Sequence, residues 1–162
     1  MIKVLDILHD TTVDGPGFRT SFYLSGCAHK CPGCHNPQSW DFGGGNEMSV
    51  EEMMQEIVSD PFADVTFSGG DPLYQAETLL PLLKRIKAET SKTVWVYTGF
   101  TYEHLPEAAQ PLLDYIDVLV DGPFVQALRD EDLLFRGSSN QRLVDIRLSR
   151  EAGSVVEWSR DF

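Results

Sequence analysis

Three cysteines within eight residues are the clearest candidates for chemistry. Cys27, Cys31 and Cys34 are the only cysteines among 162 residues, and they follow the spacing C-x3-C-x2-C. An odd number in so short a segment makes a poor disulfide framework, whereas clustered thiols in a cytosolic protein favour metal or redox chemistry. A [4Fe–4S] cluster held entirely by protein takes four cysteines. Three would leave one iron open, as catalytic metal sites do.

Two other interpretations fit the same spacing. The three cysteines suit a zinc site with His29 or His35 as the fourth ligand, although each histidine taken alone is more commonly a hydrogen-bonding loop residue. The alternative function of another class is a small metal-binding or electron-transfer module. A ferredoxin would close its cluster with a fourth cysteine. Analysis for iron and acid-labile sulfide distinguishes zinc from an iron–sulfur cluster.

Short polar segments follow three of the predicted strands. These segments are Ser68-Gly69-Gly70-Asp71-Pro72, Thr98-Gly99 and Asp121-Gly122. Ligands of parallel α/β sheets and βα barrels bind at the carboxyl ends of the strands, so we expect these segments to line the site. Taken alone, Gly69-Gly70-Asp71-Pro72 is more typical of an ordinary turn from a strand into a helix.

The elements that must position these residues follow from the hydrophobic pattern. Strands are predicted at residues 2–8, 18–24, 65–67, 93–98, 117–120 and 142–148, and helices at 49–59, 76–90 and 103–114. Ser49 and Glu52 form a capping-box pattern at the first helix. Strand 18–24 should place Phe18, Phe22 and Leu24 on one face. The strands near residues 65, 94 and 118 alternate with helices, which predicts parallel pairing.

The fold class predicted from this order is α/β. A complete eightfold βα barrel takes roughly 250 residues, so a chain of 162 residues is expected to form an incomplete, open βα barrel or a parallel sheet. We expect about five or six mostly parallel strands. No linker or repeat divides the sequence, which indicates a single domain over residues 1–162.

Charge and hydropathy exclude several classes of function. The chain has 13 Lys and Arg against 25 Asp and Glu, a net charge of −12, which argues against nucleic acid and against anionic membrane surfaces as partners. It contains no apolar run long enough for a transmembrane helix. The segment Met1–Asp6 lacks the apolar region of a signal peptide. A cytoplasmic location is therefore expected.

Several motifs together resemble one enzyme family. The C-x3-C-x2-C spacing is similar to that of radical S-adenosylmethionine (SAM) enzymes. Its flanks resemble the activating enzymes of glycyl radical proteins, through Asp14-Gly15-Pro16-Gly17-Phe18-Arg19, Gly26-Cys27, Cys34-His35-Asn36-Pro37 and Ser68-Gly69-Gly70-Asp71-Pro72-Leu73. Asp121-Gly122-Pro123-Phe124 and Arg136-Gly137-Ser138-Ser139-Asn140-Gln141-Arg142 resemble the branch that acts on the anaerobic ribonucleoside-triphosphate reductase. The resemblance covers about residues 10–148.

The resemblance implies cofactors and residue roles. Cys27, Cys31 and Cys34 would hold a [4Fe–4S] cluster whose open iron is chelated by SAM, and electron transfer into SAM would produce a 5′-deoxyadenosyl radical that abstracts hydrogen. Gly33, Cys34 and His35 would form the loop that contacts SAM. Gly69 and Gly70 would bring backbone close to the methionine end of SAM.

It also implies partners. The substrate would be the large glycyl radical subunit of the anaerobic reductase, with activation of another glycyl radical enzyme such as pyruvate formate-lyase as the alternative. Because the chain has no second cysteine cluster, the electron is expected from an external donor such as flavodoxin or ferredoxin. The chain has few residues for a lid, which favours a protein substrate. The Arg136–Arg142 segment, polar and rich in donors, is expected to dock the partner.

Overall fold

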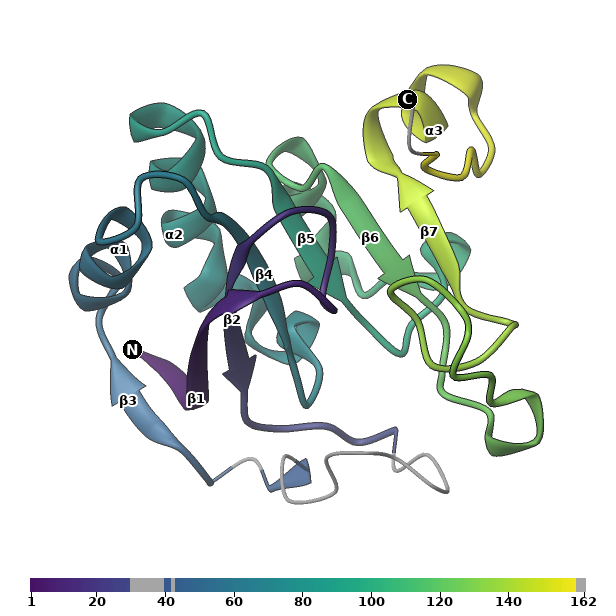
Figure 1. Cartoon of the computed structure of the whole chain (residues 1–162), viewed down its shortest axis with the longest axis horizontal. Coiled ribbons are helices and arrows are strands. Elements are labelled where there is room, and N and C mark those ends of the chain that lie inside the picture. Colours follow the sequence, from purple (N-terminus) through teal and green to yellow (C-terminus); the bar gives the residue numbers. More distant parts are fainter. Residues whose placement is uncertain (30–39, 42, 160–162) are drawn as a thin grey trace.

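The computed structural model describes residues 1–29, 40, 41 and 43–159, which form a seven-stranded sheet with helices packed on it (Figure 1). The strands are β1 (Ile2–Thr11), β2 (Arg19–Leu24), β3 (Asn46–Met48), β4 (Asp64–Gly69), β5 (Val94–Tyr97), β6 (Val118–Asp121) and β7 (Arg142–Asp145). The α-helices are α1 (Val50–Val58), α2 (Ala76–Glu89) and α3 (Ile146–Ala152). Short 3₁₀ helices span Pro72–Gln75, Tyr102–His104, Glu107–Asp114 and Gln126–Leu128.

The sheet is mixed, with its parallel part in the middle. Its order is β3-β1-β2-β4-β5-β6-β7. The predicted parallel pairing is confirmed, because β2, β4, β5 and β6 are parallel neighbours. The expectation of about five or six mostly parallel strands holds only for the middle of this seven-stranded sheet, since β1 is antiparallel to β2 and β3, and β7 is antiparallel to β6. The connection over residues 12–18 is too short for the crossover that parallel strands need.

Alternate residues of β5, β6 and β7 face two different apolar clusters. Val94 and Val96 of β5 belong to the larger cluster, which α1, α2 and the Glu107–Asp114 helix cover. Trp95 belongs to a smaller cluster on the opposite face, with Tyr97 packed against it. Successive residues of this strand therefore face opposite sides of the sheet. We call the face bearing Trp95 and Tyr97 the inner face of the sheet.

The two long helices form where the sequence predicts them. Ser49 caps α1, because its Oγ accepts a hydrogen bond from the Glu52 N–H at 3.0 Å while the Glu52 carboxylate accepts one from the Ser49 N–H at 3.2 Å. This is the predicted capping box. Helix α2 spans most of the predicted range and buries Leu79, Leu83 and Ile86.

Three local expectations are wrong, and one strand is missing from the prediction. The segment predicted as a helix at 103–114 forms 3₁₀ turns, since a proline such as Pro111 cannot donate to an α-helical ladder. The last strand ends at Asp145, whose carboxylate accepts from the Leu148 N–H and caps α3. The strand β3 was not predicted because it is short and exposed. Phe18 lies before β2 and is 62% exposed.

Arg19 ties the β1–β2 connection to the inner face. Its side chain is fully buried, and its guanidinium donates to Thr66 Oγ1 at 2.7 Å, to the Val65 carbonyl at 2.8 Å and to the Pro16 carbonyl at 3.1 Å. Burial lowers the pKa of Arg19 to about 10, which leaves it charged at neutral pH. These contacts give Arg19 a structural role.

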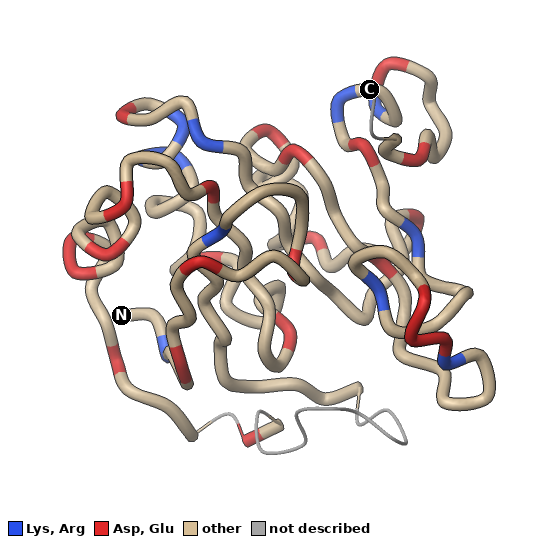
Figure 2. Tube along the Cα trace, viewed as in Figure 1, with Lys and Arg blue, Asp and Glu red and all other residues tan. Residues whose placement is uncertain are grey.

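The net negative charge is spread over the molecule. Figure 2 shows acidic residues along most of the trace, including α1 and the loop that carries Asp130, Glu131 and Asp132. Within the described ranges, no helix combines the length and the apolar character needed to cross a membrane.

Candidate functional site

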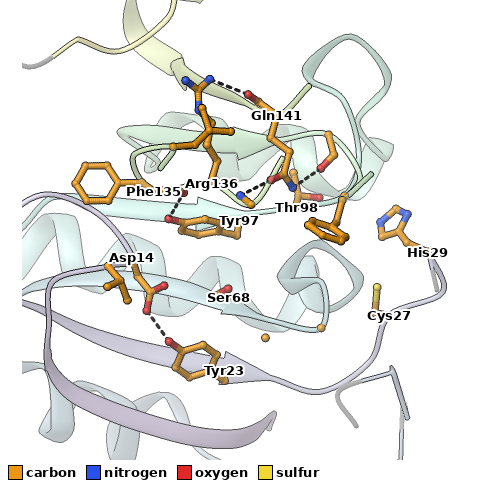
Figure 3. A pocket seen from close by; sticks show the side chains of 18 of the residues that line it. Asp14, Tyr23, Cys27, His29, Ser68, Tyr97, Thr98, Phe135, Arg136 and Gln141 are labelled. Atoms are coloured by element: carbon orange, nitrogen blue, oxygen red, sulfur yellow. Dashed lines mark hydrogen bonds between the residues drawn. The ribbon is translucent and has the colours of Figure 1, made fainter. Parts of the chain in front are cut away.

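A cavity of about 790 Å³ opens at the carboxyl ends of the parallel strands (Figure 3). Its wall combines the cysteine loop, the strand ends and two loops, through residues that include Asp14, Tyr23, Cys27, His29, Ser68, Gly69, Gly70, Tyr97, Thr98, Gly99, Gly122, Phe135, Arg136 and Gln141. The prediction that Ser68–Gly70, Thr98-Gly99 and Gly122 line one site is confirmed. The prediction does not hold for Asp71, Pro72 and Asp121, which are buried and do not line the cavity. Asp121 pairs with Arg142.

The first cysteine lies at this cavity. The chain leaves β2 at Leu24 and reaches Cys27 through Gly26, whose φ of 103° suits glycine. Cys27 is 9% exposed, and its N–H donates to the Trp40 carbonyl at 3.3 Å. Cys31, Gly33, Cys34 and His35 lie outside the described residues. Among the residues that are described, no three potential metal ligands gather in one place.

A buried carboxylate connects the cysteine loop with the strand ends. Asp71 is 1% exposed. Its Oδ2 lies 2.7 Å from His29 Nε2 and accepts from Thr98 Oγ1 at 2.8 Å and from the Gly99 N–H at 2.9 Å. Its Oδ1 accepts from the Leu73 N–H at 3.0 Å, which caps the Pro72–Gln75 helix. Four donors from three segments thus meet on one side chain.

The backbone of Asp71 adds a further link to the cysteine loop. Its N–H donates to the Gly26 carbonyl at 2.9 Å, so Asp71 forms hydrogen bonds to residues before and after Cys27 in the chain. The His29 ring also packs edge-on against Phe100, with centroids 4.6 Å apart. The interpretation of His29 as a hydrogen-bonding loop residue agrees with these contacts. Sequence reasoning identified Asp71 as part of a motif but missed its pairing with His29, because the two are far apart in the chain.

The two adjacent glycines differ in what they do. Gly69 has a φ of 102°, and a Cβ there would lie 2.5 Å from the Leu24 carbonyl oxygen. The close approach of strand β2 therefore requires glycine at this position. Gly70 has no positive φ, and its N–H donates to the Leu24 carbonyl at 2.8 Å. Both glycines line the cavity, but contact with the neighbouring backbone explains the need for glycine only at Gly69.

Two tyrosines on the inner face stand at the cavity wall. Tyr23 donates to Asp14 at 2.5 Å and Tyr97 donates to the Phe135 carbonyl at 2.6 Å (Figure 3). Burial, and then the hydrogen bond to Asp14, raise the pKa of Tyr23. Burial also raises the pKa of Tyr97, as does the negative charge of Asp14. Both phenols are therefore neutral at physiological pH, with their hydroxyl protons directed to acceptors in the protein.

The segment Arg136–Arg142 uses most of its donors internally. The Gln141 side chain accepts from the Gly137 N–H at 2.9 Å and donates to the Gly122 carbonyl, and Asn140 donates to the Pro123 carbonyl at 2.8 Å. Arg142 pairs with Asp121 and Glu103. The side chains of Asn140, Gln141 and Arg142 thus hold the segment against the strand ends at the cavity, and docking of a partner by this segment stays a prediction.

The sequence is similar to that of known proteins. The family model described as a 4Fe-4S single cluster domain matches residues 13–144. The chain is 40% identical over 139 residues to the anaerobic ribonucleoside-triphosphate reductase-activating protein of Haemophilus influenzae, covering 80% of this chain and 88% of the relative. It is 40% identical to that of Escherichia coli K12, covering 83% and 93%, and 35% identical to that of enterobacteria phage T4, covering 81% and 86%.

Proposed function

Because this chain belongs to the 4Fe-4S single cluster domain family and, within it, to the anaerobic ribonucleoside-triphosphate reductase-activating proteins, we propose that it generates a glycyl radical on the large subunit of that reductase. It is a radical SAM activase that takes a hydrogen atom from its protein substrate and releases 5′-deoxyadenosine and methionine. The observation that carries the proposal is the placement of Cys27 on the cavity formed by the glycine-rich strand ends.

The residues at the cavity fit the cofactors. Thiolates are the ligands of iron–sulfur clusters, and Cys27 lies at the wall of a cavity whose volume is within the range of small-molecule sites. Cys31 and Cys34 would complete the ligand set. The bound cluster supplies an electron of low potential and one iron without a protein ligand. Gly33, Cys34 and His35 would contact SAM from the same loop.

The chain's own residues position the reactants. Gly69 and Gly70 present backbone to the cavity, which suits the methionine end of SAM, and the adjoining Thr98-Gly99 turn is fixed by Asp71. Tyr23 and Tyr97 keep their hydroxyl groups bonded to protein acceptors. The remaining wall includes apolar residues such as Leu133, Leu134 and Phe135.

The proposal extends to the architecture and the compartment. We interpret the open sheet as a partial βα barrel of the radical SAM type, formed by a single domain over residues 1–162, whose open side faces the reductase. Cytoplasm is the proposed compartment, because reactive thiolates need a reducing environment. An external one-electron donor, such as flavodoxin or ferredoxin, completes the system, since the sequence has no cysteines beyond the three of the loop.

The central test is a paramagnetic resonance measurement on the reductase. The reconstituted protein, SAM and dithionite or reduced flavodoxin should produce the glycyl doublet on the anaerobic reductase, and omission of the reductant should abolish it. SAM cleavage without a reductant would contradict the external donor. A doublet on pyruvate formate-lyase with none on the reductase would instead identify the alternative activase.

Substitution of the two glycines should separate folding from SAM binding. Gly70→Val adds a side chain on the cavity wall without requiring a strained φ, so we expect SAM affinity to fall about tenfold or more while the cluster still assembles. Gly69→Ala places a methyl group against the backbone of Leu24, so we expect a loss of stability of about 1–3 kcal/mol. Calorimetry with SAM and chemical denaturation measure the two effects. Normal SAM affinity in Gly70→Val would remove this residue from the binding site.

A further inference from the structure

The segment Gly153–Trp158 lies beyond residues 13–144, which match the family model. Helix α3 ends at Gly153, whose φ is 72°, and the chain then returns along β7 (Figure 1). Glu157 forms an antiparallel bridge with Val144, and the Trp158 N–H donates to the Leu143 carbonyl at 2.6 Å. The segment therefore pairs with the strand edge that β6 leaves uncovered.

A buried serine fixes this return. Ser149 of α3 is 1% exposed. Its Oγ accepts from the Val156 N–H at 2.8 Å and donates to the Val156 carbonyl at 3.2 Å. The Asp145 N–H donates to the same carbonyl at 2.9 Å. The segment is thus held at both α3 and β7, and Trp158 follows directly after the fixed residues.

The Trp158 ring joins the inner-face cluster. It meets Trp95 edge to face, with centroids 5.0 Å apart, and Trp95 meets Phe135 in the same way at 5.4 Å. Such edge-to-face pairs add stabilisation beyond the area that they bury. Phe135 lines the cavity at the cysteine loop, whereas Trp95 and Trp158 line a second cavity of about 630 Å³. The three rings therefore separate the two cavities.

Phe135 needs support from its surroundings. Its φ is 61°, a left-handed conformation that is rare for a bulky side chain and persists only where the surrounding structure fixes it. Its ring is buried and its carbonyl accepts from Tyr97 at 2.6 Å. The neighbouring Arg136 belongs to the same cavity wall. The packing of Trp95 and Trp158 against the ring is thus part of what holds this wall in place.

We propose that Trp158 is a positioning residue for the activation reaction, acting through Phe135 to hold the wall of the cavity over residues 133–137. This inference rests on the proposed function, because the wall would face the segment of the reductase that enters the cavity. A displaced wall weakens binding of that segment. Loss of folded protein, by contrast, lowers the maximal rate without changing KM.

The test compares Trp158→Ala with Trp158→Phe, which keeps an aromatic ring, and with Leu148→Ala, a control on the exposed side of α3, where Leu148 is 36% exposed. In Trp158→Ala we expect amide hydrogen exchange over residues 133–137 of the reconstituted protein to accelerate about tenfold. We also expect KM for the reductase to rise about fivefold, with iron content unchanged. Trp158→Phe should restore most of both, and Leu148→Ala should resemble the wild type.

Two results would overturn the inference. Unchanged exchange over residues 133–137 in Trp158→Ala would show that the wall does not depend on this ring. Faster exchange with an unchanged KM would remove the link to the reaction. If Trp158→Ala does not fold, Trp158→Phe is compared with the wild type in its place. Its hydrogen exchange over residues 133–137 and its KM for the reductase should then approach the wild-type values. If the wild type forms no radical on the reductase, the proposed function fails, whereas the exchange result still tests the packing.

Discussion

Replacement of Cys27 by alanine is expected to lower the iron content of the reconstituted protein from about four atoms per chain to about one or fewer. The glycyl radical on the reductase should disappear with it. The sequence contains three cysteines, so the variant retains two thiolates, too few to hold a cubane cluster. Iron and sulfide analysis, with paramagnetic resonance of the dithionite-reduced protein, measures the cluster directly.

The matched control is Ala28→Ser, which changes an exposed residue of the same loop and should keep both the iron and the radical. Circular dichroism should show that Cys27→Ala remains folded, because the Cys27 N–H can still donate to the Trp40 carbonyl. A full iron complement in Cys27→Ala would exclude this thiolate from the ligand set. Stoichiometric zinc without sulfide in the wild type would show that the cysteines hold a zinc ion and not an iron–sulfur cluster.

The sequence predicts the middle of the fold well. Strands β4, β5 and β6 and the helix α2 combine strong hydrophobic periodicity with turn residues at their ends, so both their positions and their parallel pairing follow from the pattern. The capping box of α1 can also be predicted from the sequence, because Ser49 and Glu52 interact within one turn. Such local interactions are the kind that a sequence pattern can carry.

The edges of the sheet are harder to predict. The antiparallel pairing of β1 follows from the short connection at residues 12–18. The βαβ pattern of the later strands instead favours parallel pairing throughout the sheet. The strand β3 is too short for a period to appear. Asp145 is the N-cap of α3, yet Ile146 and Leu148 after it alternate with a polar residue and fit a continuing strand, because so short an apolar pattern fits either period.

For the site, spacing along the chain predicts the types of residue but not their long-range partners. The cysteine loop and the glycine-rich strand ends were predicted to meet, and Cys27, Gly69 and Gly70 do line one cavity. The bond between Asp71 and His29 joins residues 42 positions apart, and no local pattern encodes it. The hydrogen bond from the Gln141 side chain to the Gly122 carbonyl likewise depends on where Gly122 lies in the folded chain.

Asp71 is the point at which this cavity is most sensitive to a small change. Its Oδ2 receives three donors and its Oδ1 a fourth. An asparagine of the same size keeps one acceptor oxygen and turns the other into a donor. Whichever way the amide faces, at least one buried donor loses its acceptor, at about 1–3 kcal/mol for each such group. The negative charge beside His29 is lost as well.

Asp71→Asn is therefore expected to lower the rate of glycyl radical formation roughly 100-fold, while the protein still folds and binds a cluster. The reason is displacement of the cysteine loop relative to the Thr98-Gly99 turn, which Asp71 holds together. The change that SAM causes in the resonance spectrum of the reduced cluster should weaken in parallel. This spectrum reports the geometry at the cluster without depending on the reductase.

The matched control is Asp145→Asn, because Asp145 also caps a helix through its carboxylate but lies at α3, outside the wall of this cavity. Asparagine is a good N-cap, so both variants should keep their helix caps. If Asp71 acted only as a cap, both variants would show nearly wild-type activity. Thr98→Val removes one of the four donors to Asp71 and should fall between the control and Asp71→Asn. A wild-type rate and a wild-type response to SAM in Asp71→Asn would show that the cysteine loop is positioned without this carboxylate.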